Sequence, residues 1–467
     1  MRKAVKKWAS IALLLTLLLS FCACSQRAPA ASNGSAGSTP ANTETGADRL
    51  KEQKELNVLY CVSDFPSSLE AYNKEFEEKY GVKVNYSTLG ADTYFEKMLI
   101  ELSSNSDAYD SIYFFSPQFL QYASNSWLTN MDKLIADKSI TDDTLLDMGS
   151  FMPTGLEAGK YEGTTYALPV GMFTVLLYYR TDLFEAAGLK GPPDTWEDFE
   201  KYAKILHKDG VAGMAMRGAR STGGSEGSIW HWPMMLYAMG GDFVKDFPGD
   251  MTPVLNTPEA IKSVEYFTNL LQNYSIKSAT VCNYEDITVA VQQGDVAMWI
   301  DGAPIVKQYN HAEKSKSYGK IGVAPVPKGP SGRISTLNAH FLGIPANAKN
   351  KELAWAYTQW SLSYDMLVKL SVEGTFPVPA RTNVYDDPAF MDKNNVLDGK
   401  WLSVMRETLS EFTHYPYRPL TPEWPEVADI VSGEISNVMA GQITAAEAME
   451  KANKAVAEVY KEAGYIN

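Results

Sequence analysis

The stretch "GGSEGSIWHWPMM" (residues 223–235) gathers reactive and ring-shaped side chains within a few positions. Its first five residues fit G-x-S-x-G, the pattern in which a strained turn after a core strand exposes a serine nucleophile. Here the polar segment "RGARST" precedes Ser225, so the pattern lacks its strand. The aromatic rings are the better candidates for chemistry, because Trp230 and Trp232 lie on a loop and can stack on the apolar face of a ligand.

Other catalytic patterns are incomplete. The segment "GLEAGK" (residues 155–160) has neither the spacing of a phosphate-binding loop nor a Ser or Thr after Lys160. Carboxylate pairs for glycoside hydrolysis are set in space rather than in sequence, so a polysaccharide-degrading enzyme remains the alternative. No metal-ligand spacing relates the five histidines, so we expect neither metal nor cofactor. They are His207, His231, His311, His340 and His414.

The N-terminus predicts export. Residues 1–24 combine four basic residues with an apolar segment that ends at Cys24, as in a bacterial lipoprotein signal peptide. Ala23 before Cys24 fits lipidation of that cysteine, although Phe21 replaces the usual Leu, and a plain secretory signal is the alternative. Residues 25–54 are rich in Ser, Ala, Gly, Pro and Thr and predict a flexible tether. We therefore expect a lipid-anchored protein on the extracellular face of the cytoplasmic membrane.

The exported body is strongly acidic. The chain has a formal net charge of −14, and the signal segment contributes +4, which leaves −18 for the remainder. This charge excludes nucleic acid as the expected partner. Cys61 and Cys282, the two cysteines after the signal, could pair outside the cytoplasm or be separate buried residues. A body of more than 400 residues exceeds a single core, so two domains are expected.

The elements that would position a site alternate between strand and helix. Residues 55–63 and 82–89 predict strands on either side of a helix that stops at Gly81, and residues 109–115 predict a third strand. Thr195 and Thr444, each three residues before an acidic residue, predict the starts of two later helices. This α/β order indicates a parallel sheet. The apolar run of residues 172–179 is too short to cross a membrane and is followed by the charged Arg180. It predicts a buried core strand.

Seven motifs in order resemble the carbohydrate-type solute-binding proteins of ABC importers, the family that includes maltose-binding protein. They span most of residues 56–464 and include "YALPVGMFTVLLYYRTDLFEAAGL", "AVQQGDVAMWIDGAP" and "GKIGVAPVPKGPSG". The resemblance implies two discontinuous α/β lobes joined by hinge strands. It places lobe one at residues 55–170 and 322–365, and lobe two at residues 171–321 and 366–467. The chain would cross between lobes near Pro169, within residues 318–329, and near residues 361–371.

The resemblance also implies a sugar site in the interlobe cleft. Phe114 and Phe115 should point to opposite faces of their strand, so at most one of them reaches a ligand. Phe173 replaces a carboxylate of the maltose-binding member, and Pro304 stands where the family often has Trp, so the ligand should differ. The predicted ligand-binding residues are Asp64, Phe114, Ser116, Gln118, Phe173, Trp230, Trp232, Trp299, Asp301, His340, Arg381 and Trp424.

The expected function is therefore binding without catalysis. A monomer would capture a sugar or oligosaccharide by hinge closure and deliver it to a membrane permease. The alternatives are an anchored extracellular polysaccharide-degrading enzyme and a binding protein for a non-sugar polar solute.

Overall fold

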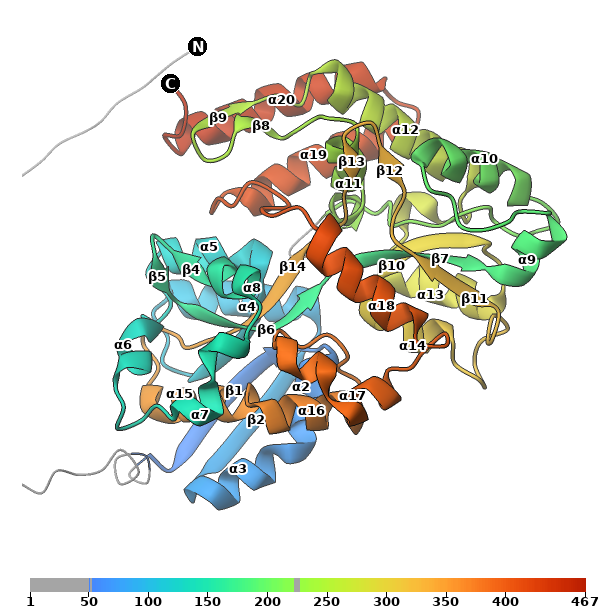
Figure 1. Ribbon diagram of the computed structural model, residues 1–467. Helices are drawn as coiled ribbons and strands as arrows, with labels where there is room; N and C mark the ends of the chain where they lie inside the picture. The colour runs from blue at the N-terminus through green and yellow to red at the C-terminus, as the bar shows by residue number, and fades with distance from the viewer. Residues whose placement is uncertain (1–49, 51–52, 222–226) are drawn as a thin grey trace, which may run out of the picture. The chain divides into compact units, whose positions relative to one another are not determined.

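The computed structural model describes residues 50, 53–221 and 227–467 (Figure 1). Cys24 and most of the predicted tether lie outside the described residues, as do Ser225 and Glu226. Two β-sheets of different topology organise the described part of the chain, and helices pack on both.

The first sheet has five strands. The three strands from the start of the chain run parallel, as predicted, and the two later strands run antiparallel to their neighbours. Across the sheet the order is β2 (Lys83–Leu89), β1 (Glu55–Cys61), β3 (Ser111–Phe115), β14 (Asn338–Gly343) and β6 (Ala167–Phe173).

Helices from both ends of the sequence share one hydrophobic cluster with this sheet. The predicted stop at Gly81 is confirmed, since Gly81 adopts a left-handed conformation (φ 69°) that suits a helix C-terminus. The helices are α2 (Asp64–Leu69), α3 (Asn73–Tyr80), α4 (Ala91–Ser103), α5 (Ser116–Ser124), α6 (Met131–Ala136), α7 (Asp143–Leu146), α8 (Pro153–Ala158), α15 (Lys351–Ser361), α16 (Tyr364–Val372) and α17 (Pro388–Lys393).

The second sheet has three antiparallel strands, β10 (Met298–Gly302), β7 (Val175–Arg180) and β11 (Ile321–Ala324). Its helices begin where the sequence predicts, because the Thr195 and Thr444 side chains accept hydrogen bonds from the backbone N–H of Asp198 and Glu447. The helices of this half are α9 (Thr181–Ala186), α10 (Trp196–Leu206), α11 (Trp232–Ala238), α12 (Pro258–Tyr274), α13 (Tyr284–Gln293), α14 (Val306–Tyr309), α18 (Lys400–Glu407), α19 (Trp424–Met439) and α20 (Ala445–Glu462).

Smaller elements complete the chain. Three two-stranded ribbons pair β4 (Lys160–Tyr161) with β5 (Thr164–Thr165), β8 (Val244–Asp246) with β9 (Asp250–Pro253), and β12 (Lys328–Gly329) with β13 (Gly332–Arg333). A π-helix (Thr408–Phe412) continues α18.

The chain passes between the two sheets at places that partly differ from the expectation. Thr174 separates β6 of the first sheet from β7 of the second, close to the passage expected near Pro169. The return comes after β13, because β11 pairs with β7; residues 322–333 therefore do not belong with the first sheet. Helix α16 contacts α2 beside the first sheet and also contacts α17, whereas the resemblance assigned residues from 366 onward to lobe two. The next passage lies between α17 and α18, since α18 contacts β11.

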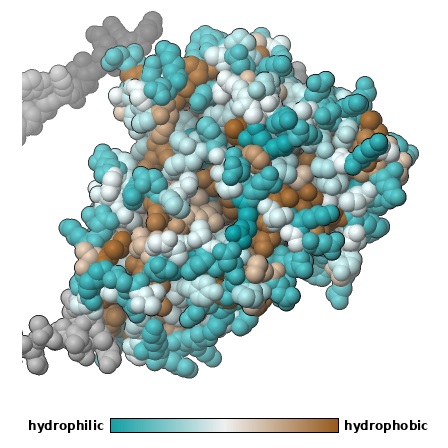
Figure 2. Space-filling view, viewed as in Figure 1, coloured by the Kyte–Doolittle hydropathy of each residue, from teal (hydrophilic) through white to brown (hydrophobic). Residues whose placement is uncertain are grey.

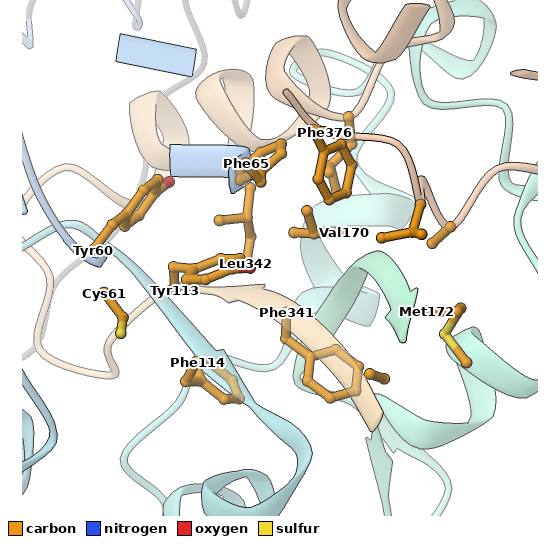
Figure 3. Close-up of a cluster of buried hydrophobic side chains, with 14 of the residues drawn as sticks. Tyr60, Cys61, Phe65, Tyr113, Phe114, Val170, Met172, Phe341, Leu342 and Phe376 are labelled. Atoms are coloured by element: carbon orange, nitrogen blue, oxygen red, sulfur yellow. The ribbon is translucent and has the colours of Figure 1, made fainter. Parts of the chain in front are cut away.

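Strand alternation divides the core. Leu176 and Tyr178 of β7 belong to the first hydrophobic cluster, whereas Val175 and Leu177 point to the opposite face and belong to the second. The first sheet likewise has two apolar faces, with Tyr113 on one and Phe114 on the other (Figure 3). The middle of each sheet is therefore filled, which leaves strand ends as the places for a site.

Candidate functional site

One group of candidate residues lies at the edge of the first sheet, around His340. Phe115 at the end of β3 is paired with His340 on β14, and Phe173 at the end of β6 is paired with Asn338. Because directly paired residues point to the same face, these four side chains share one side of the sheet. The Phe115 and Phe173 rings are half-buried, and the His340 side chain is 8% exposed.

His340 is held between two aromatic rings. Its ring centroid lies 3.8 Å from that of Phe173 and 4.1 Å from that of Phe115, with interplanar angles of 22° and 27°. The Tyr113 hydroxyl lies 2.5 Å from His340 Nδ1 and 2.9 Å from the Ser63 hydroxyl. Burial lowers the pKa of His340 well below its usual value, so the imidazole is neutral at physiological pH. Either the Tyr113 hydroxyl or His340 Nδ1 can be the donor in their hydrogen bond, depending on which ring nitrogen carries the proton.

Asp64 adds a carboxyl group beside this cluster. It begins α2, directly after Ser63, whose hydroxyl bonds to Tyr113. Burial raises the pKa of Asp64 to about 6, although the Thr375 hydroxyl at 3.5 Å and the Lys307 charge oppose the shift. The side chain therefore titrates close to neutral pH.

A second group, on the other sheet, centres on Arg217 and Asp301. The two side chains form an ion pair in which Asp301 is fully buried and the Arg217 side chain is 18% exposed. The guanidinium lies 6.0 Å from the Trp230 ring centroid and 5.5 Å from that of Tyr284, within cation–π range. Burial opposes the charge on Arg217, but Asp301 outweighs it and holds the pKa of Arg217 above its usual value.

Backbone contacts hold this pair in place. The Gly302 N–H donates to Asp301 Oδ1 (2.7 Å), and the Arg217 N–H donates to Nδ1 of the fully buried His231 (2.8 Å). Burial, with the Arg217 charge, keeps the pKa of His231 well below its usual value, so that ring is neutral. Asp301 Oδ2, Arg217 Nε and Trp230 Nε1 are buried without a hydrogen-bond partner among the described residues. The pair thus has unused hydrogen-bonding capacity.

Electrostatic contacts connect the two groups. Burial is the main cause of the lowered pKa of Lys307 (α14) and of the raised pKa of Asp64, and the charge of each opposes the shift of the other. Burial also raises the pKa of Tyr284, with smaller contributions from Glu285 and Asp64. Tyr284 in turn packs against Arg217. Such coupling falls off with distance, so the Asp64 carboxyl lies within electrostatic range of Lys307 and Tyr284.

Several residues predicted to bind a ligand lie in the core instead. Phe114 is fully buried against Phe119, Tyr122 and Phe341, so Phe115 is the member of the pair at the site. Arg381 is also fully buried: it donates to the Ser150 hydroxyl and to backbone carbonyls. These two side chains therefore stabilise the first half of the molecule.

Three tryptophans from the prediction also belong to the core. Trp232 donates from Nε1 to the Ser263 hydroxyl (2.9 Å) inside the second cluster. Trp299 stacks on Tyr178 with ring centroids 5.7 Å apart, and Trp424 packs edge-on against Phe243. Each of the three is at most 2% exposed.

Two predicted residues have mixed roles. The Ser116 hydroxyl donates to the Ala339 carbonyl and accepts from the Ala339 N–H, so it ties α5 to β14. Gln118 is buried in α5, and its Oε1 has no hydrogen-bond partner among the described residues. Of the predicted set, the structure brings Asp64, Phe173 and His340 together on one side and Trp230 with Asp301 on the other.

Arg217, Tyr284 and Lys307 were not predicted from the sequence. Arg217 precedes the Gly/Ser-rich loop and Tyr284 begins α13, so 67 positions separate two side chains in contact. One signal in the sequence pointed toward Arg217. Asp301 was predicted to lie in the site, and a carboxylate that becomes buried needs a cation beside it.

Other features bear on the class of site. A hollow of about 680 Å³ beside His207, Lys277 and Asp295 contains no residue of the two groups. Among the described residues no cluster of three His, Cys, Asp or Glu side chains could hold a metal ion. No described helix has the length and apolar character to cross a bilayer. Cys61 and Cys282 are buried and are not joined by a disulfide.

Comparison with known proteins places this chain in a family. The model of the family "bacterial extracellular solute-binding protein" matches residues 62–366. An erythritol/L-threitol-binding protein of Mycolicibacterium smegmatis is 25% identical over 71% of this chain and 71% of its own length. A mannitol-binding protein of Pseudomonas aeruginosa is 23% identical over 85% of this chain and 91% of its own.

Solved structures share the fold. An ABC transporter solute-binding protein of Agrobacterium radiobacter K84, in complex with ribitol, superposes with a TM-score of 0.77. It is 23% identical, and the match covers 87% of this chain and 98% of that one. The expected two-lobed α/β fold with discontinuous lobes is therefore confirmed. The chain belongs to the bacterial extracellular solute-binding proteins of ABC transporters.

Proposed function

We propose that this protein is the lipid-anchored receptor of an ABC importer and that it captures a neutral polyol or small sugar. The Arg217–Asp301 pair carries the proposal. A guanidinium donates and a carboxylate accepts, so together they match the neighbouring hydroxyl groups of a polyol. Their charges cancel, which favours a neutral solute over an anion or cation.

The aromatic residues supply the apolar part of the site. Tyr284 is 41% exposed beside Arg217, and the half-buried Phe115 and Phe173 flank His340. The carbon skeleton of a polyol can pack on these rings while its hydroxyls reach Arg217, Asp301 and the His340 imidazole. Named ligands of the similar proteins, erythritol, mannitol and ribitol, support this class.

Closure of two lobes would complete the site. We assign residues 55–173 and 335–393 to one lobe, and residues 175–334 and 400–467 to the other. Two of the passages meet at Ser335, whose hydroxyl bonds to Thr174 Oγ1 (2.9 Å) and whose N–H donates to the Phe412 carbonyl (2.7 Å). This junction is the proposed hinge, and solute contacts with both lobes favour the closed form. The closed monomer then docks on the permease.

The lipid anchor is a separate part of the proposal. It rests on the basic, apolar and small-residue order that ends at Cys24. Metabolic labelling with an alkyne fatty acid tests it. We expect Cys24→Ala to abolish labelling and to release the protein, and Cys22→Ala to retain both label and anchor. Labelling that survives Cys24→Ala would refute this assignment.

A matched pair of arginine variants tests the binding site. Arg217→Lys keeps the charge but loses the planar guanidinium, whereas Arg220→Lys changes an exposed arginine paired with Asp429. Thermal unfolding is measured with and without ribitol, erythritol, mannitol and maltose. A solute at a hundred times its Kd stabilises the folded state by about 2.7 kcal/mol. We expect that stabilisation in wild type and Arg220→Lys and its loss in Arg217→Lys; equal stabilisation of both variants would remove Arg217 from the site.

A further inference from the structure

A pocket of about 280 Å³ lies where several parts of the chain meet. One wall comes from the start of α8, another from the segment Thr382–Asp386, and a third from the end of α18 and the π-helix (Thr408–Phe412). β6 and the residue before β14 form its floor. The lining residues are Met152, Pro153, Thr154, Met172, Leu337, Thr382, Tyr385, Arg406, Leu409, Ser410 and Thr413.

This pocket is separate from the candidate solute site. Met172 lines the pocket, while the adjacent Phe173 stacks on His340. Successive residues of a strand point to opposite faces, so the two sites lie on opposite sides of β6. In Figure 3, Phe376 lies on one side of the first sheet and Phe341 on the other. No residue of the solute site lines the pocket.

The lining combines an apolar body with hydrogen-bond acceptors. Met152, Met172, Leu337 and Leu409 provide apolar surface. The hydroxyls of Thr382, Ser410 and Thr413 donate to backbone carbonyls at 3.0–3.1 Å, so their oxygens keep lone pairs for a donor. The surface in Figure 2 shows hydrophobic residues among hydrophilic ones on the face seen in Figure 1.

The charge at the pocket is balanced. Arg406 donates to Asp386 at 3.0 Å, so a bound anion would compete with a carboxylate already in place. A guanidinium has five N–H donors, and Arg406 retains donors for a neutral ligand oxygen. An apolar cavity of about 150 Å³ can hold a benzene molecule, so a pocket of nearly twice that volume has room for a substituted ring.

The π-helix is a second, independent observation. Such segments are uncommon and often occur at functional sites. Here the π-helix contributes Leu409 and Ser410 to the pocket wall. Its Phe412 carbonyl accepts a hydrogen bond from the Ser335 N–H. It thus connects the pocket wall to the junction between the two halves.

From these features we propose a second small-molecule site at this pocket, specific for a neutral monocyclic phenol or alcohol. The ring packs between the methionine and leucine side chains. The hydroxyl accepts from Arg406 and donates to the Ser410 or Thr413 oxygen. The proposal stands independently of the solute at the first site.

The test uses 4-methylphenol and ligand-observed NMR titration of the folded chain from residue 50 onward. Ser410 is exposed, so Ser410→Phe should fold and obstruct the pocket; Ser403→Phe places the same ring on α18 outside it. We expect saturable binding, at least tenfold weaker in Ser410→Phe and unchanged in Ser403→Phe. Arg217→Lys should also bind as wild type does, because it alters only the solute site.

A second readout does not depend on that variant. With methyl-labelled methionine, the Met152 and Met172 resonances should shift as 4-methylphenol is added, whereas that of Met439, buried in the second cluster, should not. The absence of saturable binding would overturn the proposal. Equal binding by Ser410→Phe and Ser403→Phe, loss of binding in Arg217→Lys, or unshifted Met152 and Met172 resonances would also overturn it.

Discussion

Asp64→Asn should change how the stability of the protein depends on pH. Asp64 is half-buried at the start of α2, and burial raises its pKa to about 6 from the ordinary value of 3.8. A raised carboxyl pKa means that the folded state holds its proton more tightly than the unfolded state does. The Asp64 contribution to the free energy of unfolding is therefore present below about pH 4 and is lost as the pH rises to about 6.

The magnitude follows from the shift. Each pKa unit corresponds to about 1.4 kcal/mol, so a shift of roughly two units removes on the order of 3 kcal/mol between pH 4 and pH 7. Asn cannot ionise and loses nothing over this range. The difference in unfolding free energy, variant minus wild type, should therefore rise by about that amount from pH 4 to pH 7.

Urea denaturation of the solute-free domain at several pH values measures this difference. Asp392→Asn is the control, because Asp392 is an exposed carboxylate on α17. We expect its difference from wild type to stay constant with pH. If the difference in unfolding free energy between Asp64→Asn and wild type also stays constant, or falls as the pH rises, then burial does not raise the pKa of Asp64.

Two further substitutions have defined outcomes. Tyr284→Ala removes the exposed ring beside Arg217 and should weaken solute binding at least tenfold by calorimetric titration, about 1.4 kcal/mol, whereas the similarly exposed Tyr318→Ala should leave affinity unchanged. Gly171→Ala would place a Cβ 2.6 Å from the Val378 carbonyl and should cost about 1–3 kcal/mol of stability in urea denaturation. Gly191→Ala, where the new Cβ meets no atom within 4 Å, should be near neutral, and equal effects of the two alanines would contradict this packing.

Local sequence signals predicted local structure well. The stop at Gly81 and the caps at Thr195 and Thr444 are confirmed because each depends on neighbouring residues alone. The three parallel strands are confirmed for the same reason, since their period and spacing are local properties. The return passage, expected within residues 318–329, follows β13 because β11 pairs with β7, in which Arg180 lies 141 residues before its partner Ile321.

The candidate site depended on tertiary contacts that no local pattern records. Alternation predicted opposite faces for Phe114 and Phe115, but which face meets His340 depends on β14, more than 200 residues later. Trp232 looked like a loop aromatic and proved to be core, because the Ser263 hydroxyl from α12 accepts its indole N–H. Arg217 was overlooked since its partners, Asp301 and Tyr284, are distant in sequence.

Capture of an intact solute is most directly tested by isothermal titration of the chain from residue 50 onward against polyols and small sugars. Each solute is recovered from the cell afterwards and analysed for cleavage. We predict saturable one-site binding of a neutral polyol or sugar, with the solute recovered unchanged and the binding lost in Arg217→Lys. Cleavage of the solute would identify an anchored enzyme, and absence of saturable binding across the panel would contradict the assignment of the Arg217–Asp301 site to polyols and sugars.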